Sequence, residues 1–303
     1  MSIELAHLQG SYKANALLSD QERINWIRQE RWIQYARAER ILHRLGDLVD
    51  YPPRDRMPCL VIYGATGMGK TRIIQKFLRD NRSRFDEKLG KTRLPVVSIQ
   101  MPPSPSERDL YEEILAGLGG VFSTSLSVTT LRHRIRVLAR QMDVRMLVID
   151  EIHSILAGTF REQRIILNAI RFLANDLRIP LVCVGTQEAN QALMTDQQLA
   201  DRFEAAELPA WELDQTFQQL LLSFESTLPL RKPSDFRDSK VHQRILGLTE
   251  GVLVGICRLL ETAAPEAIRS GQERIDLSLL ADHLVAESLV SIVDRRNRRV
   301  SVR

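Results

Sequence analysis

The sequence has no long apolar run and no pairing pattern among its few cysteines. Its longest purely apolar stretches lie at residues 60–63 and 146–149, far short of the roughly 18 residues that a membrane-spanning helix needs. Cys59, Cys183 and Cys257 stand singly among apolar neighbours, which argues against a metal or disulfide framework and predicts buried thiols. The first residues also lack a basic start followed by a hydrophobic segment, so we expect a cytoplasmic protein with no membrane association.

A strong excess of one charge is absent as well. The 303 residues carry 42 Lys+Arg and 38 Asp+Glu, a formal net charge of +4, and 44% of them are hydrophobic. This balance is too apolar and too nearly neutral for a disordered chain, and the length leaves room for one large and one small domain. A pI of 9.1 is compatible with nucleic acid as a partner without requiring it.

Apolar spacing indicates three kinds of segment. A helical pattern extends from residue 20 to about 49 and ends at the proline-rich stretch YPPRDRMP. Nearly continuous apolar runs then alternate with helical stretches, at residues 59–64, 95–101, 145–151 and 180–186, with a weaker run at 206–213. Strands that are apolar on both faces are typical of a parallel sheet covered on both sides. We therefore predict an α/β fold with a five-stranded parallel sheet.

The remainder of the sequence is helical and completes a four-part organisation. Helices are expected at residues 216–228, 239–248, 252–263 and 277–288. The predicted parts are an N-terminal helical appendage (1–57), an α/β core (58–213), a small all-α domain (214–290) and a basic tail (291–303) with the sequence RRNRRVSVR at its end. The appendage contains Trp26 and Trp32, and we expect it to pack onto the α/β core, with a docking surface for a partner as the alternative.

A phosphate-binding loop stands between the first apolar run and the following helix. Its sequence fits the pattern GxxxxGK[ST] in full, and a strand before it and a helix after it are the context that this motif requires. Glycines turn backbone N–H groups towards phosphates, Lys70 reaches the β- and γ-phosphates, and Thr71 supplies an oxygen to Mg²⁺. With both flanks in place, a chance glycine loop is disfavoured. The loop consists of Gly64, Ala65, Thr66, Gly67, Met68, Gly69, Lys70 and Thr71.

The run RMLVIDE supplies the acidic half of a nucleotide site. An acidic residue at the carboxyl end of a buried strand lies beside the phosphate loop in such sheets. Asp150 is expected to hold Mg²⁺ through water, and Glu151 to orient or deprotonate the attacking water. An alternative is that the two acids only cap a helix start. Together the two motifs predict an ATPase that uses ATP and Mg²⁺.

These motifs, together with VGT at 184–186, the segment LADRFEAAELPAW and the distal GVLVGICRLL, resemble the AAA+ ATPases. More narrowly, the chain resembles the TniB-type transposition regulators, which are relatives of TnsC and MuB. The resemblance covers about residues 20 to 290. It implies an AAA+ P-loop fold with a helical lid formed by the C-terminal domain.

The resemblance also assigns roles to three further residues. Thr186 corresponds to sensor 1, which helps to position the attacking water. Arg202 corresponds to the arginine finger that reaches a neighbouring subunit's nucleotide, and Arg258 to sensor 2 on a lid helix. Each has a simpler alternative: a strand-end threonine, a surface ion pair, and a basic side chain lying over an apolar helix. If Arg202 acts in trans, the site is complete only in a homo-oligomer, a ring or a helical filament.

In the resembled family, ATP-bound subunits assemble along duplex DNA and contact its backbone. Such contacts need basic side chains, hydroxyls or helix N-termini. The segment 123–136 offers all three, and a capped helix with a solvated basic face uses the same residues. The candidate contacts there are Ser127, Thr129, Thr130, Arg132, Arg134 and Arg136. Weaker candidates are Lys91 and Arg93, which precede the second strand, and the basic tail.

The function implied is an ATP-dependent, sequence-nonspecific duplex-DNA-binding regulator of DNA transposition. It assembles on target DNA, recruits and activates a cognate transposase, and leaves on hydrolysis. An AAA+ replication initiator or helicase loader would keep the same nucleotide residues and differ in its partner, and a scaffold that barely hydrolyses ATP is a further alternative. A helicase is disfavoured because two sheet domains would exceed the chain length. DNA strand chemistry is assigned to the transposase, since no acidic metal-binding triad stands outside the nucleotide site.

Overall fold

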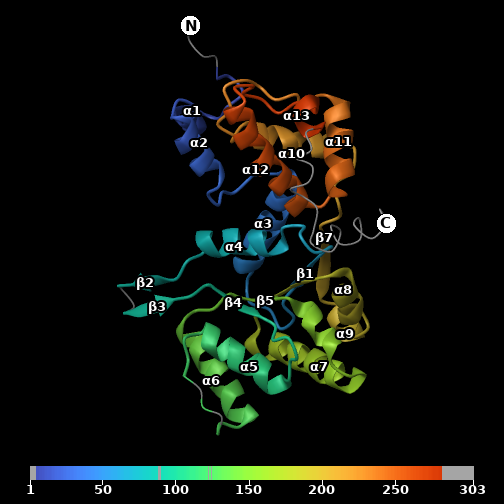
Figure 1. Cartoon of the computed structure of the whole chain (residues 1–303). Helices are drawn as coiled ribbons and strands as arrows, with labels where there is room; N and C mark the ends of the chain where they lie inside the picture. Colours follow the sequence, from blue (N-terminus) through green and yellow to red (C-terminus); the bar gives the residue numbers. More distant parts are fainter. Residues whose placement is uncertain (1–4, 88–89, 122, 124, 282–303) are drawn as a thin grey trace. The chain divides into compact units, whose positions relative to one another are not determined.

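The computed structural model describes residues 5–87, 90–121, 123 and 125–281. The chain forms two compact units (Figure 1). Residues 37–209 make up one, which we call the α/β unit, and the residues up to Ala36 together with those from Ala210 make up the other, the helical unit. The sequence-based boundaries fell at 57/58 and 213/214, so the segment before the first strand is shared between the units.

A five-stranded parallel sheet forms the centre of the α/β unit. Its strands stand in the order β4-β5-β6-β1-β7, with every neighbouring pair parallel. This confirms the predicted five-stranded parallel sheet, and four of the strands lie within the runs that the sequence indicated. The strands are β1 (Cys59–Tyr63), β4 (Val96–Gln100), β5 (Met146–Asp150), β6 (Leu181–Gly185) and β7 (Phe203–Glu207).

Helices cover this sheet, and the core lies between them and the strands. Strand residues such as Val61 and Ile149 are fully buried in one cluster with Ile114 and Ile170 from the helices, as expected for strands covered on both faces. The helices that cover the sheet are amphipathic. Each has its apolar residues along one stripe that packs on the strands, and polar residues on its outer face. The helices of this unit are α3 (Ala36–Val49), α4 (Lys70–Asp80), α5 (Glu107–Gly117), α6 (Val128–Gln141), α7 (Phe160–Leu177), α8 (Gln187–Met194) and α9 (Gln197–Ala200), with a short 3₁₀ helix η1 (Ile152–Ala157).

The fifth strand begins earlier than the sequence indicated. The run at 206–213 was expected to form it, whereas β7 begins at Phe203, which pairs with Cys59. Pro209 follows the strand, and because proline has no N–H to donate to a neighbouring strand, the pairing stops before it.

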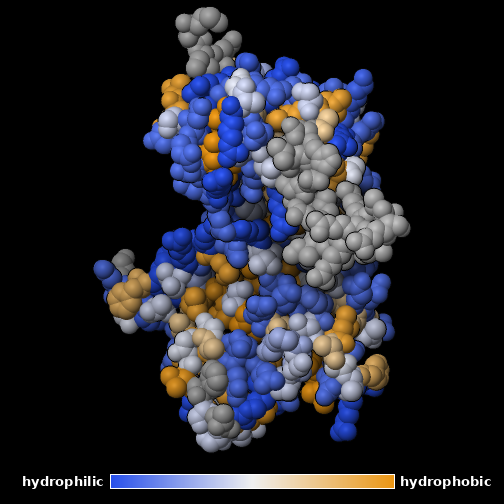
Figure 2. Space-filling model, in the orientation of Figure 1, coloured by the Kyte–Doolittle hydropathy of each residue, from blue (hydrophilic) through white to orange (hydrophobic). Residues whose placement is uncertain are grey.

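A two-stranded hairpin, which was not expected, forms a separate sheet. β2 (Arg84–Asp86) and β3 (Lys91–Arg93) pair antiparallel and do not join the five-stranded sheet. The hairpin extends from the unit at the left of Figure 1, and Figure 2 shows hydrophobic colour on this otherwise polar projection. The exposed hydrophobic residue is Phe85, which is 65% exposed. Strands of three mostly polar residues give no alternating pattern, so the sequence carried no signal for them.

The predicted helix at 20–49 is wrong in its continuity. It is two helices, α2 (Asp20–Ile27) and α3, separated by a non-helical stretch. Within that stretch, Trp32 stacks on Tyr35, with ring centroids 6.4 Å apart, and Tyr35 packs edge-on against Trp211 at 5.7 Å. Burying these rings against a residue far along the chain outweighs local helix propensity.

The helical unit contains the first part of the appendage that was expected to pack on the α/β core. Residues from Arg37 onward belong to the α/β unit, whereas α2, with its buried Ile24 and Ile27, packs on α12. The unit's elements are α1 (Gly10–Ala16), α2, α10 (Gln215–Glu225), α11 (Ser239–Thr249), α12 (Leu253–Arg269) and α13 (Leu277–Ala281). Residues 282–288 of the expected last helix and the arginine-rich tail lie outside the described residues. No helix of the described chain is long and apolar enough to cross a membrane.

The three cysteines differ in how deeply they are buried. Cys59 and Cys183 are buried, as predicted, and burial raises the pKa of Cys59 to about 11 and that of Cys183 as well. Cys257 is only half-buried, so the prediction is wrong for this residue. On α12 it lies one residue after Ile256, which is buried together with Leu260 on one face of the helix. One residue corresponds to a rotation of about 100° around the helix axis, which turns the thiol away from that face.

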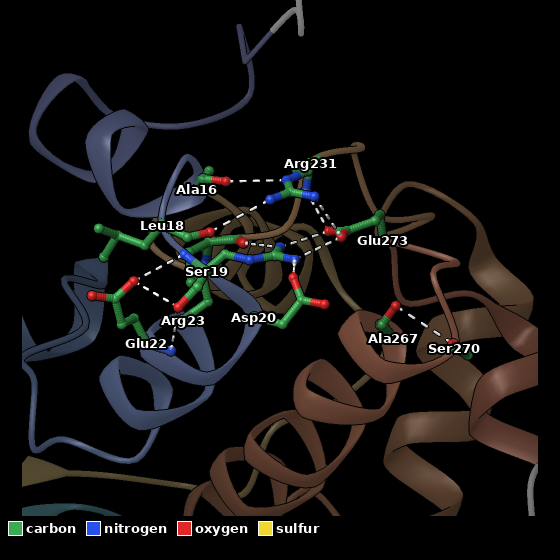
Figure 3. A network of polar contacts seen from close by, with 11 residues as sticks. Ala16, Leu18, Ser19, Asp20, Glu22, Arg23, Arg231, Ala267, Ser270 and Glu273 are labelled. Atoms are coloured by element: carbon green, nitrogen blue, oxygen red, sulfur yellow. Dashed lines mark hydrogen bonds and ion pairs between the residues drawn. The ribbon is translucent and has the colours of Figure 1, made fainter.

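A buried arginine ties the N-terminal segment to the C-terminal helices (Figure 3). The Arg23 side chain is fully buried and donates from its two terminal nitrogens to the two Glu273 oxygens, each at 2.7 Å. It also donates to Asp20 at 2.7 Å and to the carbonyl of Pro229 at 3.0 Å. Arg231 joins the network through Glu273 at 3.6 Å. A paired guanidinium in this setting is strongly coupled to its partner, because either charge alone would be buried without compensation.

We expect Arg23→Ala to destabilise the helical unit by about 3–5 kcal/mol, because the buried Glu273 would lose its two-pronged partner and keep only Arg231, 3.6 Å away. The three tryptophans, Trp26, Trp32 and Trp211, all belong to this unit, so tryptophan fluorescence during urea unfolding follows it selectively. The matched control is Arg269→Ala, which breaks an exposed ion pair with Glu266 at 3.1 Å and should cost less than about 1 kcal/mol. Equal losses in the two variants would contradict a special role for the buried pair.

Candidate nucleotide-binding and hydrolysis site

The phosphate loop occupies the turn between β1 and α4. Gly67 and Gly69 have φ of 83° and 86°, values at which a side chain is strained, which explains glycine at both positions. A Cβ on Gly64 would lie 2.3 Å from the carbonyl oxygen of Leu208, so this position also excludes a side chain. No side chain caps the N-terminus of α4, and its first N–H groups are therefore available to phosphate oxygens.

The Lys70 side chain lies against the phosphate loop. Its Nζ donates to the carbonyl oxygens of Gly64 at 2.7 Å and Ala65 at 2.9 Å. Burial lowers the pKa of Lys70, while the nearby charges of Glu151 and Asp150 oppose that shift. The ammonium group thus lies inside the loop, close to the acidic residues that follow β5.

The two motifs meet through a direct hydrogen bond. The Thr71 hydroxyl on α4 donates to Asp150 Oδ2 at 2.8 Å, and the other carboxylate oxygen of Asp150 accepts from the backbone N–H of Glu151 at 2.8 Å. A hydroxyl and a carboxylate next to a phosphate loop form the hard oxygen donor set that Mg²⁺ prefers, usually with waters and phosphates completing its shell. The residues present therefore fit Mg²⁺ bound together with a nucleotide.

Glu151 holds an uncommon backbone conformation. It stands directly after β5, with φ 55° and ψ 35°, a left-handed region that costs a side-chain-bearing residue about 1 kcal/mol or more. Its carboxylate lies 3.2 Å from Nε2 of His153, and both side chains are 38% exposed. The carboxylate is therefore partly accessible to water and fixed by a neighbouring ring.

Thr186 lies at the same edge of the sheet. It follows Gly185 at the end of β6, and β6 stands between β5 and β1. The carboxyl ends of parallel strands share one edge, so Thr186 lies between the phosphate loop and Glu151. Its hydroxyl donates to the Glu188 carboxylate, which is the main reason that the pKa of Glu188 is lowered.

Arg202 lies at the opposite edge of the sheet. It precedes β7, and its carbonyl accepts from the N–H of Cys59, the first residue of β1, at 2.9 Å. Five residues of strand separate that point from the phosphate loop, about 16 Å along β1. The guanidinium donates to Asn175 Oδ1 at 2.6 Å, and its Nη1 is buried with no hydrogen-bond partner among the described residues.

Two other arginines line a cavity together with Arg202. Arg54 and Arg56, from the segment before β1, line the same cavity of about 420 Å³. Of the acids there, Glu204 is held by Arg44 in a two-pronged ion pair with distances of 2.6 and 2.9 Å. The pairing of β1 with β7 brings Arg54 and Arg56 close to Arg202. These residues lie far apart in the sequence, so no local pattern predicted that they would share a cavity.

Arg258 lies in the other unit. It is exposed on α12, whereas the phosphate loop belongs to the α/β unit. Its assignment to sensor 2 stays a prediction.

The expected DNA contacts on α6 have structural partners. Ser127 caps α6 by accepting from the N–H of Thr130 at 3.1 Å, and Arg134 donates to the carbonyl of Val121 at 2.8 Å. Arg132 pairs with Glu107 and lies over the rings of Tyr111 and Phe172. Thr129 is exposed, and Arg136 pairs with Asp176 at 2.8 Å. These contacts are those of a capped helix with engaged basic residues, and DNA binding by α6 stays a prediction.

A family model described as bacterial TniB protein matches residues 23–213, well over half of the chain. The chain belongs to the bacterial TniB family. This agrees with the resemblance drawn from the phosphate loop, the run RMLVIDE and the three later segments. No curated protein matches this TniB-family chain.

Solved structures share the fold. The Aeropyrum pernix ORC1 protein in complex with DNA is 17% identical over 94% of this chain and 73% of that one, with a TM-score of 0.59. The Aeropyrum pernix ORC2 protein in ADPNP and ADP complexes is 16% identical over 91% and 74%, also at 0.59. Drosophila ORC bound to DNA is 14% identical over 96% and 70%, at 0.55. The TniB-family chain therefore has the AAA+ P-loop fold, and likeness at these identities speaks for fold alone.

We expect Lys70→Ala to weaken ATP binding at least about tenfold, since a charge-assisted contact to the phosphates is lost. A fluorescent ATP analogue titrated by anisotropy measures the affinity. Lys76→Ala is the matched control, because Lys76 lies on the same helix and pairs with Asp80 at 2.5 Å. Unchanged affinity in Lys70→Ala would contradict the assignment of the loop.

Proposed function

We propose that this TniB-family chain is an ATP-dependent, sequence-nonspecific duplex-DNA-binding regulator of DNA transposition in the cytoplasm. It assembles on target DNA, recruits and activates a partner transposase, and is released by ATP hydrolysis. The observation that carries the proposal is the hydrogen bond from Thr71 to Asp150, which joins the phosphate loop to the acidic strand end in a chain of the TniB family.

Hydrolysis follows from the groups gathered at the carboxyl edge of the sheet. Lys70 and the N–H groups of the loop bind the phosphates, and Thr71 and Asp150 would hold Mg²⁺, Asp150 through water. Mg²⁺ at this position would offset the charge that develops on the phosphate oxygens. Glu151 orients or deprotonates the attacking water, and Thr186 contacts the same water from the neighbouring strand end.

A second subunit supplies the remaining charge. Arg202 lies at the amino edge of the sheet, at the opposite end of β1 from the nucleotide site of its own chain. A head-to-tail arrangement places the amino edge of one subunit on the carboxyl edge of the next, and repetition of this contact gives a ring or a filament. Arg202 then neutralises transition-state charge in the neighbour, an effect worth several orders of magnitude in turnover in other enzymes with arginine fingers.

We expect duplex DNA to stimulate ATP turnover at fixed salt, because assembly on DNA completes each site, and Glu151→Gln to abolish the stimulated rate while ATP still binds. Steady-state phosphate release measures both. Binding of ATP without any response to duplex DNA would contradict the DNA-assembled switch.

Mixing two inactive variants tests the trans arrangement within the same assay. Arg202→Ala keeps Glu151, and Glu151→Gln keeps Arg202, so a head-to-tail assembly of both restores intact junctions. Equal random mixing makes about a quarter of the junctions intact. If the mixture stays as inactive as each variant alone, Arg202 does not act in trans.

The hairpin β2–β3 is the element best suited to contact DNA. Its register places Arg84 opposite Arg93, and like charges directly opposite each other destabilise a strand pair. Asp86 offsets only part of this charge, through an ion pair with Arg93 at 3.2 Å. The other face presents Phe85 opposite Thr92. A two-stranded ribbon fits the major groove of B-DNA, and phosphates compensate paired arginines.

We expect Arg84→Ala with Arg93→Ala to weaken duplex binding and to reduce the slope of log affinity against log salt by about 2, one for each phosphate contact. Fluorescence anisotropy over a salt series measures the slope. Arg237→Ala with Arg269→Ala removes the same net charge from exposed positions of the helical unit and serves as the control. Equal slopes for the two double variants would remove the hairpin from the DNA interface.

A replication initiator or helicase loader is the second candidate. The ORC neighbours favour it only through the shared fold, whereas the family match favours transposition. Stimulation of a transposase by the ATP-bound chain on DNA distinguishes the two, since a loader has no effect on strand transfer.

A further inference from the structure

The short helix η1 packs closely against the end of β6. Ile152 and Ile155 of η1 are buried, and a Cβ on Gly185 would lie 2.6 Å from Cγ2 of Ile152 and 3.4 Å from the backbone nitrogen of His153. Glycine at this strand end therefore permits a close approach of two backbones. The backbone of His153 is held at the edge where the phosphate loop, Glu151 and Thr186 meet.

His153 binds the carboxylate assigned to water activation. Nε2 of the ring lies 3.2 Å from Oε2 of Glu151. The other ring nitrogen, Nδ1, is buried and has no hydrogen-bond partner among the described residues. A neutral ring that donates from Nε2 keeps Nδ1 unprotonated, so the ring can orient the carboxylate without taking away its capacity to accept a proton.

A second acidic side chain lies at the start of the helix that packs against η1. Thr186 immediately precedes α8, and α8 packs against η1. Glu188, in the first turn of α8, accepts from the Thr186 hydroxyl, which lowers the pKa of Glu188. The packing of α8 on η1 therefore holds Thr186 and His153 at the same end of the sheet.

We infer that His153 is a positioning residue for ATP hydrolysis, whose ring orients the Glu151 carboxylate. The inference rests on the proposed role of Glu151. Its physical basis is the mobility of a partly exposed glutamate, which has many rotamers unless a neighbour selects one. A catalytic carboxylate displaced by about 1 Å can lose on the order of a hundredfold in rate.

The test is steady-state ATP turnover with duplex DNA by the full chain and its His153 variants. We expect His153→Ala to lower kcat about 10- to 100-fold with little change in KM for ATP, because the carboxylate loses its orientation and the phosphate contacts remain. His153→Gln should recover most of the rate, since its amide N–H can replace Nε2–H as the donor to Glu151. A nucleotide-binding titration of each variant shows that the α/β unit is folded.

A matched histidine serves as control. His43 on α3 lies 3.3 Å from the Asp47 carboxylate, an equivalent pair outside the site, and His43→Ala should leave kcat and KM unchanged.

The outcomes separate this inference from the function on which it rests. If the unaltered chain turns over no ATP, the proposed function fails. If it does so and Glu151→Gln abolishes turnover, then an unchanged kcat in His153→Ala overturns the positioning role. Equal defects in His153→Ala and His153→Gln also overturn it, because packing rather than the donated hydrogen bond would then be responsible.

Discussion

The position of β1 between β6 and β7 is the constraint on which the site depends. Because β1 is paired in parallel on both sides, the loop that follows it emerges next to the end of β6, and β5 ends one strand further along. Lys70, Thr71, Asp150, Glu151 and Thr186 are thereby gathered from three strand ends. A single inverted strand would carry one of these groups to the other edge, so the chemistry depends on parallel pairing more than on any one side chain.

Much of this arrangement could be predicted from the sequence, for a physical reason. Strands buried on both faces are nearly uniform in apolar character, and the phosphate loop needs glycines at fixed places, so both leave strong local patterns. Thr186, Arg202 and Arg258 were reached only through family resemblance. The hairpin left no pattern, because Arg84 and Arg93 become neighbours only through a register that short polar strands do not signal.

What the sequence did not reveal depends on partners distant along the chain. Arg132 was expected to contact DNA, but it pairs with Glu107, which lies 25 residues earlier in the chain. The break between α2 and α3 arises from Trp211, and the burial of Arg23 from Glu273, 250 residues away. His153 lies two residues after Glu151, a spacing that carries no signal for a role in the site. Its position there depends on the close packing of η1 against the end of β6.

The two edges of the sheet also constrain how an assembly can form. The proposed phosphate site is at the carboxyl edge and Arg202 at the amino edge, with the length of β1 between them. A two-fold dimer that joins carboxyl edges leaves both copies of Arg202 away from the nucleotides, and one that joins amino edges leaves both sites uncovered. Only a head-to-tail contact serves both groups, and such a contact does not saturate at two subunits. On this reasoning hydrolysis and growth of the assembly depend on the same junction, so loss of the γ-phosphate weakens the contact that brought Arg202 into place.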